Sequence, residues 1–542
     1  MIERPGDLTT ALGALLVAGS LWLQPPAPPW IPDPGDGTFR NPVIYADYSD
    51  PDVVRVGSDF FMVSSSFTSV PGLPVLHSRD LVNWSLVNHA LPRLVPEAAF
   101  RTPQHGAGVW APSIRHHAGK YWIYYPDPDY GIYVVTAADP RGRWSDPVLV
   151  KPGRGLIDPC PLWDDDGTVY LVHAFARSRA GFANVLHLNR LTPDGQRVAD
   201  DGRIVIDGDK IAGYTTLEGP KFYKRNGWYY IFAPAGGVKQ GWQSVFRSRA
   251  VGGPYEHRIV LAQGSTDING PHQGALVDTP NGDWWFVHFQ DAEAYGRIVH
   301  MQPVRWQGDW PVVGDDADGD GTGEPRRVWR RPAVPAAAPA VPATTDTFEG
   351  RRLGLQWQWQ ANPSEAWWSF PGEGRSLRLE AVPNAANLWT APNLLLQKFP
   401  APAFRASTVL DGGRLLEWDR AGLIVFGSDY AWIGMERTGR GLRLVVRRVE
   451  NAQAGGPEQD VFAAPLTGPR VAVEVNVREG ATFEFAFGPA SGASRSAGPA
   501  FKARPGRWVG AKVGLFAAAP AGRTATGSVT ASAFLVAPLR ND

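Results

Sequence analysis

The feature that most constrains the fold is a motif that recurs five times along the first 330 residues. Each copy has a proline near its start, then a short strand, a polar turn containing glycine and an aromatic strand, as in LEGPKFYKRNGWYYIFA. The prolines of the five copies are Pro51, Pro112, Pro159, Pro220 and Pro271. A period of roughly fifty to sixty residues with three or four strands per unit is typical of a propeller blade. We therefore predict an all-β chain that begins with a five-bladed β-propeller over residues 38–330.

Acidic residues stand at the start of three of these repeats. The innermost strand of each blade lines the propeller axis, so the first residues of the repeated strands should gather at one mouth of the channel. They are Asp50, Trp110, Asp158, Glu218 and His272. An aspartate before proline often only opens a turn. Three acids at comparable positions of a fivefold repeat instead indicate a shared functional site, because an isolated buried charge is costly.

A second, smaller β-domain is expected after the propeller. Residues 331–345 are rich in proline and alanine, which is typical of a linker or an extended strap. The runs RLVVRRVE, VAVEVNV, ATFEFAF and SVTASAFLVA follow, and they alternate apolar with polar residues. This pattern predicts antiparallel strands with one buried face. We interpret residues 346–542 as a β-sandwich of jelly-roll type.

The N-terminal 37 residues resemble a leader followed by a proline-rich linker. Thr9 to Leu23 is apolar and has the length of a signal-peptide core rather than a membrane span. Acidic residues precede it, so the segment lacks the usual positive start. We expect an exported protein, periplasmic or extracellular, with no integral span in its mature form. The formal net charge of zero gives no indication of a nucleic-acid partner.

The repeated stretches resemble glycoside hydrolase family 43, whose members are five-bladed propeller enzymes that cleave pentose sugars. The resemblance runs in order through the whole propeller, and the tail beginning TFEGRRLGLQWQWQANP resembles the concanavalin-like β-sandwich attached to β-xylosidases of that family. It is carried by RNPVIYADYSDPDVVRVG, GVWAPSIRHHAGKYWIYY, GLIDPCPLWDDDGTVYLVH, LEGPKFYKRNGWYYIFAPAGG, NGPHQGALVDTPNGDWWFVH and YGRIVHMQPVRW.

The resemblance implies a role for each of the three acids. Asp50, in SDPD, matches the general base, and Glu218, in LEGP, matches the general acid. Asp158, in LIDP, matches a third acid that modulates the pKa of the general acid. Like-charge repulsion gives the physical reason, since a neighbouring carboxylate favours the protonated form of an acid that must donate a proton.

Four further residues match substrate-binding positions of the family. Arg297, in YGRIV, matches an arginine that contacts the sugar, and Trp110 and Phe67 match aromatic walls. His272, in GPHQG, matches a histidine near the axis that in relatives often lies beside a water or a calcium ion. One departure concerns Ser69, where many β-xylosidases of the family have an aromatic residue, and this weakens the expectation of a strict xylose preference.

No cofactor is required for the expected chemistry, although structural calcium is possible at two places. One is the region of His272. The other is the alternating sequence Asp316, Asp318 and Asp320, which resembles a calcium loop. The distal glutamate of an EF-hand is absent there, because position twelve is Arg327, and a solvated turn is the simpler interpretation.

These observations predict a glycoside hydrolase that removes terminal xylose or arabinose from hemicellulose oligosaccharides with inversion. The expected partner is therefore an oligosaccharide or polysaccharide. Two alternatives stay open. One is a retaining propeller hydrolase of fructosides, which also uses three acids, and the other is a propeller that binds sugar without cleaving it. Binding alone has no need of a carboxylate with a tuned pKa, so the three acids favour an enzyme.

Overall fold

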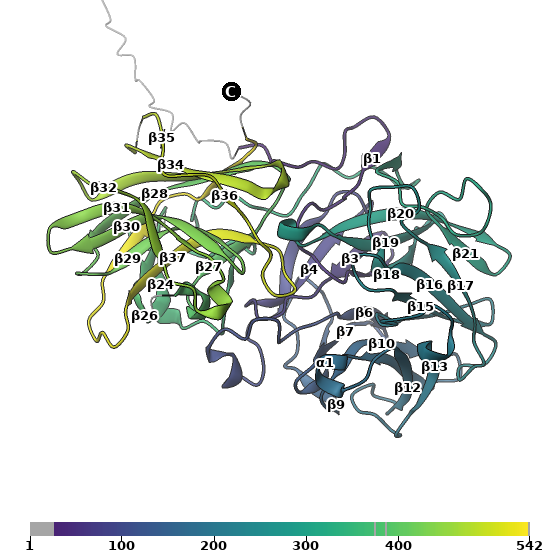
Figure 1. The fold of residues 1–542 in the computed structure, drawn as a ribbon. Helices are drawn as coiled ribbons and strands as arrows, with labels where there is room; N and C mark the ends of the chain where they lie inside the picture. The colour runs from purple at the N-terminus through teal and green to yellow at the C-terminus, as the bar shows by residue number, and fades with distance from the viewer. Residues whose placement is uncertain (1–25, 373–374, 385–386, 491, 540–542) are drawn as a thin grey trace, which may run out of the picture.

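The structure is a computed structural model that describes residues 26–372, 375–384, 387–490 and 492–539. It confirms an all-β chain in which a five-bladed propeller is followed by a β-sandwich (Figure 1). The apolar leader Thr9 to Leu23 lies outside the described residues. Within those residues, no helix has both the length and the apolar character needed to cross a bilayer.

Each blade is a four-stranded antiparallel sheet whose strands follow one another in sequence. The blades are β2 (Asp52–Val56), β3 (Asp59–Val63), β4 (Gly72–Ser78) and β5 (Ser85–Leu91); β6 (Ser113–His117), β7 (Lys120–Asp127), β8 (Gly131–Ala137) and β9 (Val148–Pro152); β10 (Leu156–Trp163), β11 (Val169–Phe175), β12 (Val185–Leu191) and β13 (Arg203–Asp207); β14 (Lys221–Arg225), β15 (Trp228–Ala235), β16 (Trp242–Ser248) and β17 (Glu256–Leu261); and β18 (His272–Asp278), β19 (Trp284–Asp291), β20 (Arg297–Gln307) and β21 (Trp310–Val313).

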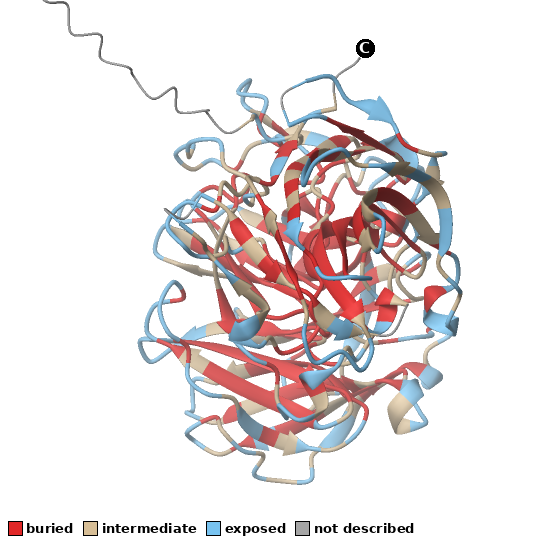
Figure 2. Cartoon of the chain, turned by 90° about the vertical axis from the view of Figure 1, so that its left-hand side faces the viewer, coloured by how far each residue is buried: buried red, intermediate tan, exposed pale blue. Residues whose placement is uncertain are grey.

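Turn chemistry explains the hairpins of the repeat. Asn226 and Gly227 link β14 to β15, and both have positive φ, as a two-residue hairpin turn requires. The second strand of this blade, WYYIFAPA, is largely buried because neighbouring blades cover both of its faces. Buried strands accordingly fill the centre of both domains (Figure 2).

The ring is closed by the first and last blades and by the N-terminal segment. Side chains of β3 and β19 share one hydrophobic core. Strand β1 (Thr38–Arg40) pairs with β22 (Val328–Arg330), which follows the fifth blade. The side chain of Asn41 exchanges two hydrogen bonds of 2.8 Å with the backbone of Met301. Segments from the two ends of the propeller sequence thus hold the ring shut.

Two sheets form the C-terminal sandwich, and β33 (RVAVEVNVR) alternates buried with partly exposed residues as predicted. The first sheet contains β23 (Gln358–Trp359), β26 (Val382–Asn384), β27 (Leu395–Lys398), β29 (Arg420–Phe426), β30 (Tyr430–Thr438), β31 (Gly441–Val449), β32 (Gln459–Pro465) and β37 (Lys512–Pro520); the second contains β24 (Trp368–Ser369), β25 (Leu377–Glu380), β28 (Phe404–Arg414), β33 (Arg470–Arg478), β34 (Thr482–Gly488), β35 (Arg495–Ser496), β36 (Phe501–Lys502), β38 (Ser528–Ala531) and β39 (Leu535–Ala537).

Helical elements are single turns on the connections between strands. They are α1 (Arg177–Ala180) and the 3-10 turns η1 (Ala99–Arg101), η2 (Gly208–Lys210), η3 (Glu293–Tyr295), η4 (Glu365–Trp367), η5 (Leu388–Thr390), η6 (Ala452–Ala454) and η7 (Glu479–Ala481). One of these turns joins the domains. Tyr295, in the last blade, belongs to the hydrophobic core of the sandwich, and its hydroxyl donates to the carbonyl of Pro402 at 2.7 Å. The sandwich is therefore packed firmly against the propeller.

Candidate active site

Positive φ angles occur at the starts of the inner strands, where the site is predicted to lie. Asp50 and Asp158 have φ values of 55° and 56°, and Gln273, beside His272, has 41°. The pairing of β10 and that of β18 are each interrupted by a register shift at these residues. Bulges of this kind re-aim side chains, and strained non-glycine residues cluster at functional sites.

Asp50 lies in a dense set of hydrogen-bond donors. Its carboxyl group accepts from the hydroxyls of Ser49, at 3.0 Å, and Ser65. The guanidinium of Arg297 donates to both carboxyl oxygens, at 3.2 and 3.4 Å. The Asp50 side chain is only 5% exposed. An ionised carboxylate, which only accepts hydrogen bonds, fits this arrangement.

Asp158 is held against the segment that carries Glu218. One of its carboxyl oxygens accepts from the backbone N–H of Gly219 at 2.7 Å, so it fixes the residue that follows Glu218. Burial, and then the charge of Glu218, raise the pKa of Asp158 well above its ordinary value; the charge of Asp50 acts in the same direction. The electrostatic coupling to both acids shows that the three predicted carboxyl groups share one site.

Burial and the neighbouring negative charges favour the protonated form of Asp158. The sequence-based interpretation assigned the raised pKa to the general acid through the influence of Asp158. The structure places a raised pKa on Asp158 itself, because Asp158 is the deeply buried member of the pair and is 3% exposed. Burial penalises its charged form directly.

Glu218 is the most accessible of the three acids. Its side chain is 24% exposed, and one carboxyl oxygen lies 3.1 Å from Nε2 of the fully buried His272. A group that transfers a proton to a departing oxygen must reach the substrate, so this exposure suits a proton donor. His272 thus contacts Glu218 directly, which the sequence alone did not indicate.

Arg297 links the acids to an aromatic wall. Its backbone N–H donates to Asp47 at 2.9 Å, and its guanidinium lies 4.9 Å from the ring centroid of Phe289 and 5.8 Å from that of Trp508. These contacts leave the guanidinium in one orientation. It can then form directed hydrogen bonds to a hydroxylated ligand beside Asp50.

The aromatic wall combines both domains. The ring of Phe67 lies 6.1 Å from that of Trp110, which in turn lies 6.1 Å from that of Trp508. Trp508 comes from the sandwich and is 46% exposed, and sequence reasoning missed it. The only signal was its position as the first residue of the run WVGAKVGLF, which the sequence predicts to be a strand. Phe67 and Trp110 lie in this wall, as the resemblance implied.

The sandwich also reaches Ser69, where family relatives often have an aromatic residue. The buried Ser69 hydroxyl accepts from Nζ of Lys512 at 2.7 Å. Burial lowers the pKa of Lys512 to about 7. Beside it, the backbone N–H of Gly510 donates to Asp47 at 2.9 Å. The wall around position 69 is thus built by polar contacts between domains rather than by an aromatic ring.

Carboxyl oxygens of Asp316, Asp318 and Asp320 lie within 4.8 Å of one another, so the predicted calcium loop does bring them together. Asp318 and Asp320 are exposed, and Arg327, at position twelve, forms an ion pair with Asp267 at 2.6 Å. Exposed carboxylates of this kind also form solvated turns. Near His272, the ring contacts Glu218, and its Nδ1 has no hydrogen-bond partner among the described residues.

Carboxyl groups in unequal environments, beside an arginine and a row of aromatic rings, define the machinery for hydrolysis of a glycosidic bond. Comparison with known proteins agrees with this class. Residues 39–311 match the model of glycosyl hydrolases family 43. Residues 345–534 match the β-xylosidase C-terminal concanavalin A-like domain.

Relatives extend the match over most of the chain. A β-xylosidase of Formosa agariphila is 30% identical over 536 residues, covering 89% of this chain and 88% of its own length. A non-reducing end α-L-arabinofuranosidase of Bacteroides ovatus is 31% identical over 437 residues, covering 76% and 79%. The solved structure of a family 43 protein from a Bacteroides ovatus xyloglucan locus has a TM-score of 0.81 at 27% identity, with 92% and 99% coverage. The chain belongs to glycosyl hydrolase family 43.

Replacement of Trp508 by alanine should raise KM about tenfold on an aryl glycoside and change kcat less, because the wall contributes binding in both ground and transition states. Steady-state kinetics measure this effect. Trp418 is the matched control, since it is 50% exposed, belongs to the same domain and also has a positive φ. If the KM of Trp508→Ala equals the KM of the control variant Trp418→Ala, the aromatic wall does not contact the substrate.

Asp158→Asn should increase the free energy of unfolding, relative to the wild type, by more at neutral pH than at acidic pH. The raised pKa of Asp158 means that the native state keeps a proton that the unfolded chain loses above its ordinary value of 3.8. The wild-type free energy of unfolding therefore falls as the pH rises through that window, by at most about 1.4 kcal/mol per pH unit for one proton. Asparagine has no such proton to lose.

Melting temperatures of both proteins at about pH 5 and about pH 7.5 test this linkage. The stability gained by the variant should be larger at the higher pH. If the melting temperatures of the variant and the wild type differ by the same amount at both pH values, Asp158 is ionised in the native protein.

Proposed function

We propose that this protein is an exo-acting glycosidase that removes terminal xylose or arabinose from hemicellulose oligosaccharides with inversion at the anomeric carbon. One observation carries the proposal: the coupled acids and Arg297 lie beside an aromatic wall that the sandwich completes with Trp508. The names of the two relatives, a β-xylosidase and an α-L-arabinofuranosidase, support the choice of a pentose.

In the proposed mechanism, Glu218 protonates the departing oxygen as the bond to the sugar breaks. Asp50, held by Ser65 and Arg297, takes a proton from water as that water attacks the opposite face. Asp158 positions Glu218 by accepting a hydrogen bond from the backbone N–H of Gly219. The net reaction adds water across the glycosidic bond and returns both carboxyl groups to their starting protonation after proton exchange with solvent.

A single displacement should release the sugar with its anomeric configuration inverted, because water attacks from the side opposite the leaving group. Proton NMR of the first turnovers, recorded before mutarotation, distinguishes this result from retention. Retention would instead favour the fructoside-type alternative, in which Asp50 acts as a nucleophile. The chemistry as proposed uses only carboxylates and water, without a cofactor.

Aryl β-D-xyloside and aryl α-L-arabinofuranoside give the most informative comparison of substrates. We expect kcat/KM on at least one of them to exceed that on aryl β-D-glucoside by about 100-fold or more. The glucoside carries an additional hydroxymethyl group, which we expect the aromatic wall to exclude. Turnover of fructosides alone would favour the retaining alternative. Binding of xylose without turnover of any glycoside would favour a sugar-binding propeller.

We also propose that the protein is exported, on the basis of the apolar stretch from Thr9 to Leu23. Fractionation of expressing cells tests this proposal: the protein should be found outside the cytoplasm, and removal of residues 1–25 should retain it inside. An unchanged distribution after removal of the segment would contradict the role of this stretch.

A further inference from the structure

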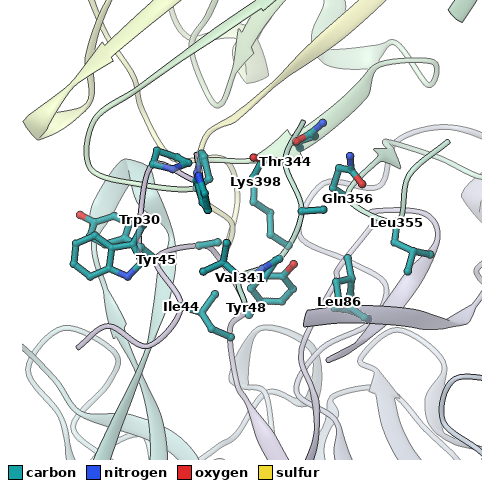
Figure 3. Close-up of a pocket in the computed structure, with 18 of the residues that line it drawn as sticks. Trp30, Ile44, Tyr45, Tyr48, Leu86, Val341, Thr344, Leu355, Gln356 and Lys398 are labelled. Carbon is teal, nitrogen blue, oxygen red and sulfur yellow. The ribbon is translucent and has the colours of Figure 1, made fainter. Parts of the chain in front are cut away.

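A cavity lies between the propeller, the sandwich and the linker that joins them, and the mechanism does not use it (Figure 3). Its empty volume is about 630 Å³, which includes the solvent space at its open mouth. The walls are mainly apolar and aromatic, and include Trp30, Ile44, Tyr45, Tyr48, Leu86 and Val341. They come from the N-terminal segment, the first blade and the linker.

The cation Lys398 faces this cavity. Lys398, the last residue of β27, makes no hydrogen bond or ion pair with any described residue, and its ammonium group lies 5.0 Å from the ring centroid of Tyr48. Figure 3 shows it among Tyr48, Val341 and Thr344. The charge of Asp47 acts on this ammonium group, but the carboxyl oxygens of Asp47 accept from the backbone N–H groups of Arg297 and Gly510. The half-buried ammonium can therefore still take a hydrogen-bonded anion from the cavity.

Two polar atoms of the lining are buried and have no hydrogen-bond partner within the described part of the chain. They are Nε2 of Gln397 and Nδ1 of His89, in side chains that are 3% and 9% exposed. Burial, and then the charge of Lys398, lower the pKa of His89 to about 3, so its imidazole is neutral near pH 7. The lining therefore offers one positive charge and an amide donor.

We propose that this cavity binds a small monocarboxylate with an aromatic or branched aliphatic body. The carboxylate would accept hydrogen bonds from Lys398 and Gln397, and the apolar body would pack on Tyr48, Leu86 and Val341. A cation is excluded by Lys398. A free sugar is a poor fit, because most of its hydroxyls would face apolar walls without partners. A phosphate group fits poorly too, since a single ammonium cannot neutralise its double charge.

An occupant of this cavity would connect parts of the molecule that are distant in sequence. Lys398 and Gln397 belong to the sandwich, Tyr48 and His89 to the propeller, and Val341 to the linker. Because the ligand would contact all three only when the domains are docked, it should stabilise the docked state. Binding should therefore raise the melting temperature of the full-length protein.

Benzoate is the probe, and benzyl alcohol is its uncharged control. Isothermal titration and thermal melting of the full chain should show benzoate binding and stabilisation, with little effect of benzyl alcohol. Lys398→Met should weaken benzoate at least about tenfold, the value of one charge-assisted hydrogen bond. Without ligand, this variant should melt at the wild-type temperature or above it, because the half-buried ammonium that is removed forms no ion pair with the described residues.

Two control variants locate the binding. Lys120→Met removes an exposed positive charge elsewhere on the propeller and should leave benzoate affinity unchanged. Arg297→Gln removes the cation of the catalytic site, so retained affinity in this variant places benzoate outside that site. The proposal is overturned if benzoate does not bind, if benzyl alcohol binds equally well, if Lys398→Met binds benzoate like the wild type, or if Arg297→Gln abolishes binding.

Discussion

Glu218→Ala should lose roughly 10²–10⁴-fold in kcat/KM on a natural disaccharide such as xylobiose, and much less on a dinitrophenyl glycoside. A sugar leaving group is a poor anion and needs a full proton as it departs. Dinitrophenolate is a stable anion and needs almost none. The partly exposed carboxyl group of Glu218, beside His272, is the group placed to supply that proton.

Glu218→Gln provides the control for this comparison, because the amide keeps the size of the side chain and its contact with His272 but cannot donate an acidic proton. It should follow the alanine variant on both substrates. Equal losses of Glu218→Ala on the natural and the activated substrate would show that Glu218 does not act as the general acid.

Asp50→Asn should reduce kcat by at least about 10³-fold on both substrates, since water must be activated whichever group departs. Asparagine can keep hydrogen bonds with Ser49 and Ser65, so the fold should survive, and thermal melting checks that it does. The same large loss on the dinitrophenyl glycoside separates this residue from Glu218. A loss of less than about tenfold on either substrate would contradict its role as the base.

Local chemistry explains how much of the propeller and of its acids could be predicted. Asn226-Gly227 has the conformational freedom of a hairpin turn, and each aromatic strand that follows such a turn must be buried. Because the repeat places the start of every inner strand at one end of the axis, Asp50, Asp158 and Glu218 were expected to share a site. Their electrostatic coupling agrees with that expectation.

Other properties of the site depend on contacts between residues that are far apart in the sequence. The depth of burial decides that the raised pKa lies on Asp158, and burial is a property of everything packed around a residue. The contact between His272 and Glu218 joins residues at the starts of the inner strands of two neighbouring blades. The register of the repeat alone, which differed between these positions, could not establish such a contact.

The sequence by itself determined the periodic elements: five blades, a sandwich and acids at the starts of inner strands, because turns and burial patterns are encoded over a few residues. Only the tertiary structure decided what the domains do to each other. It brings Trp508 to the aromatic wall, Lys512 to Ser69, and Lys398 to the cavity beside Tyr48. These pairs are separated by more than 300 residues, and no repeat or turn relates them. Their proximity follows from the packing of two independently patterned cores against each other.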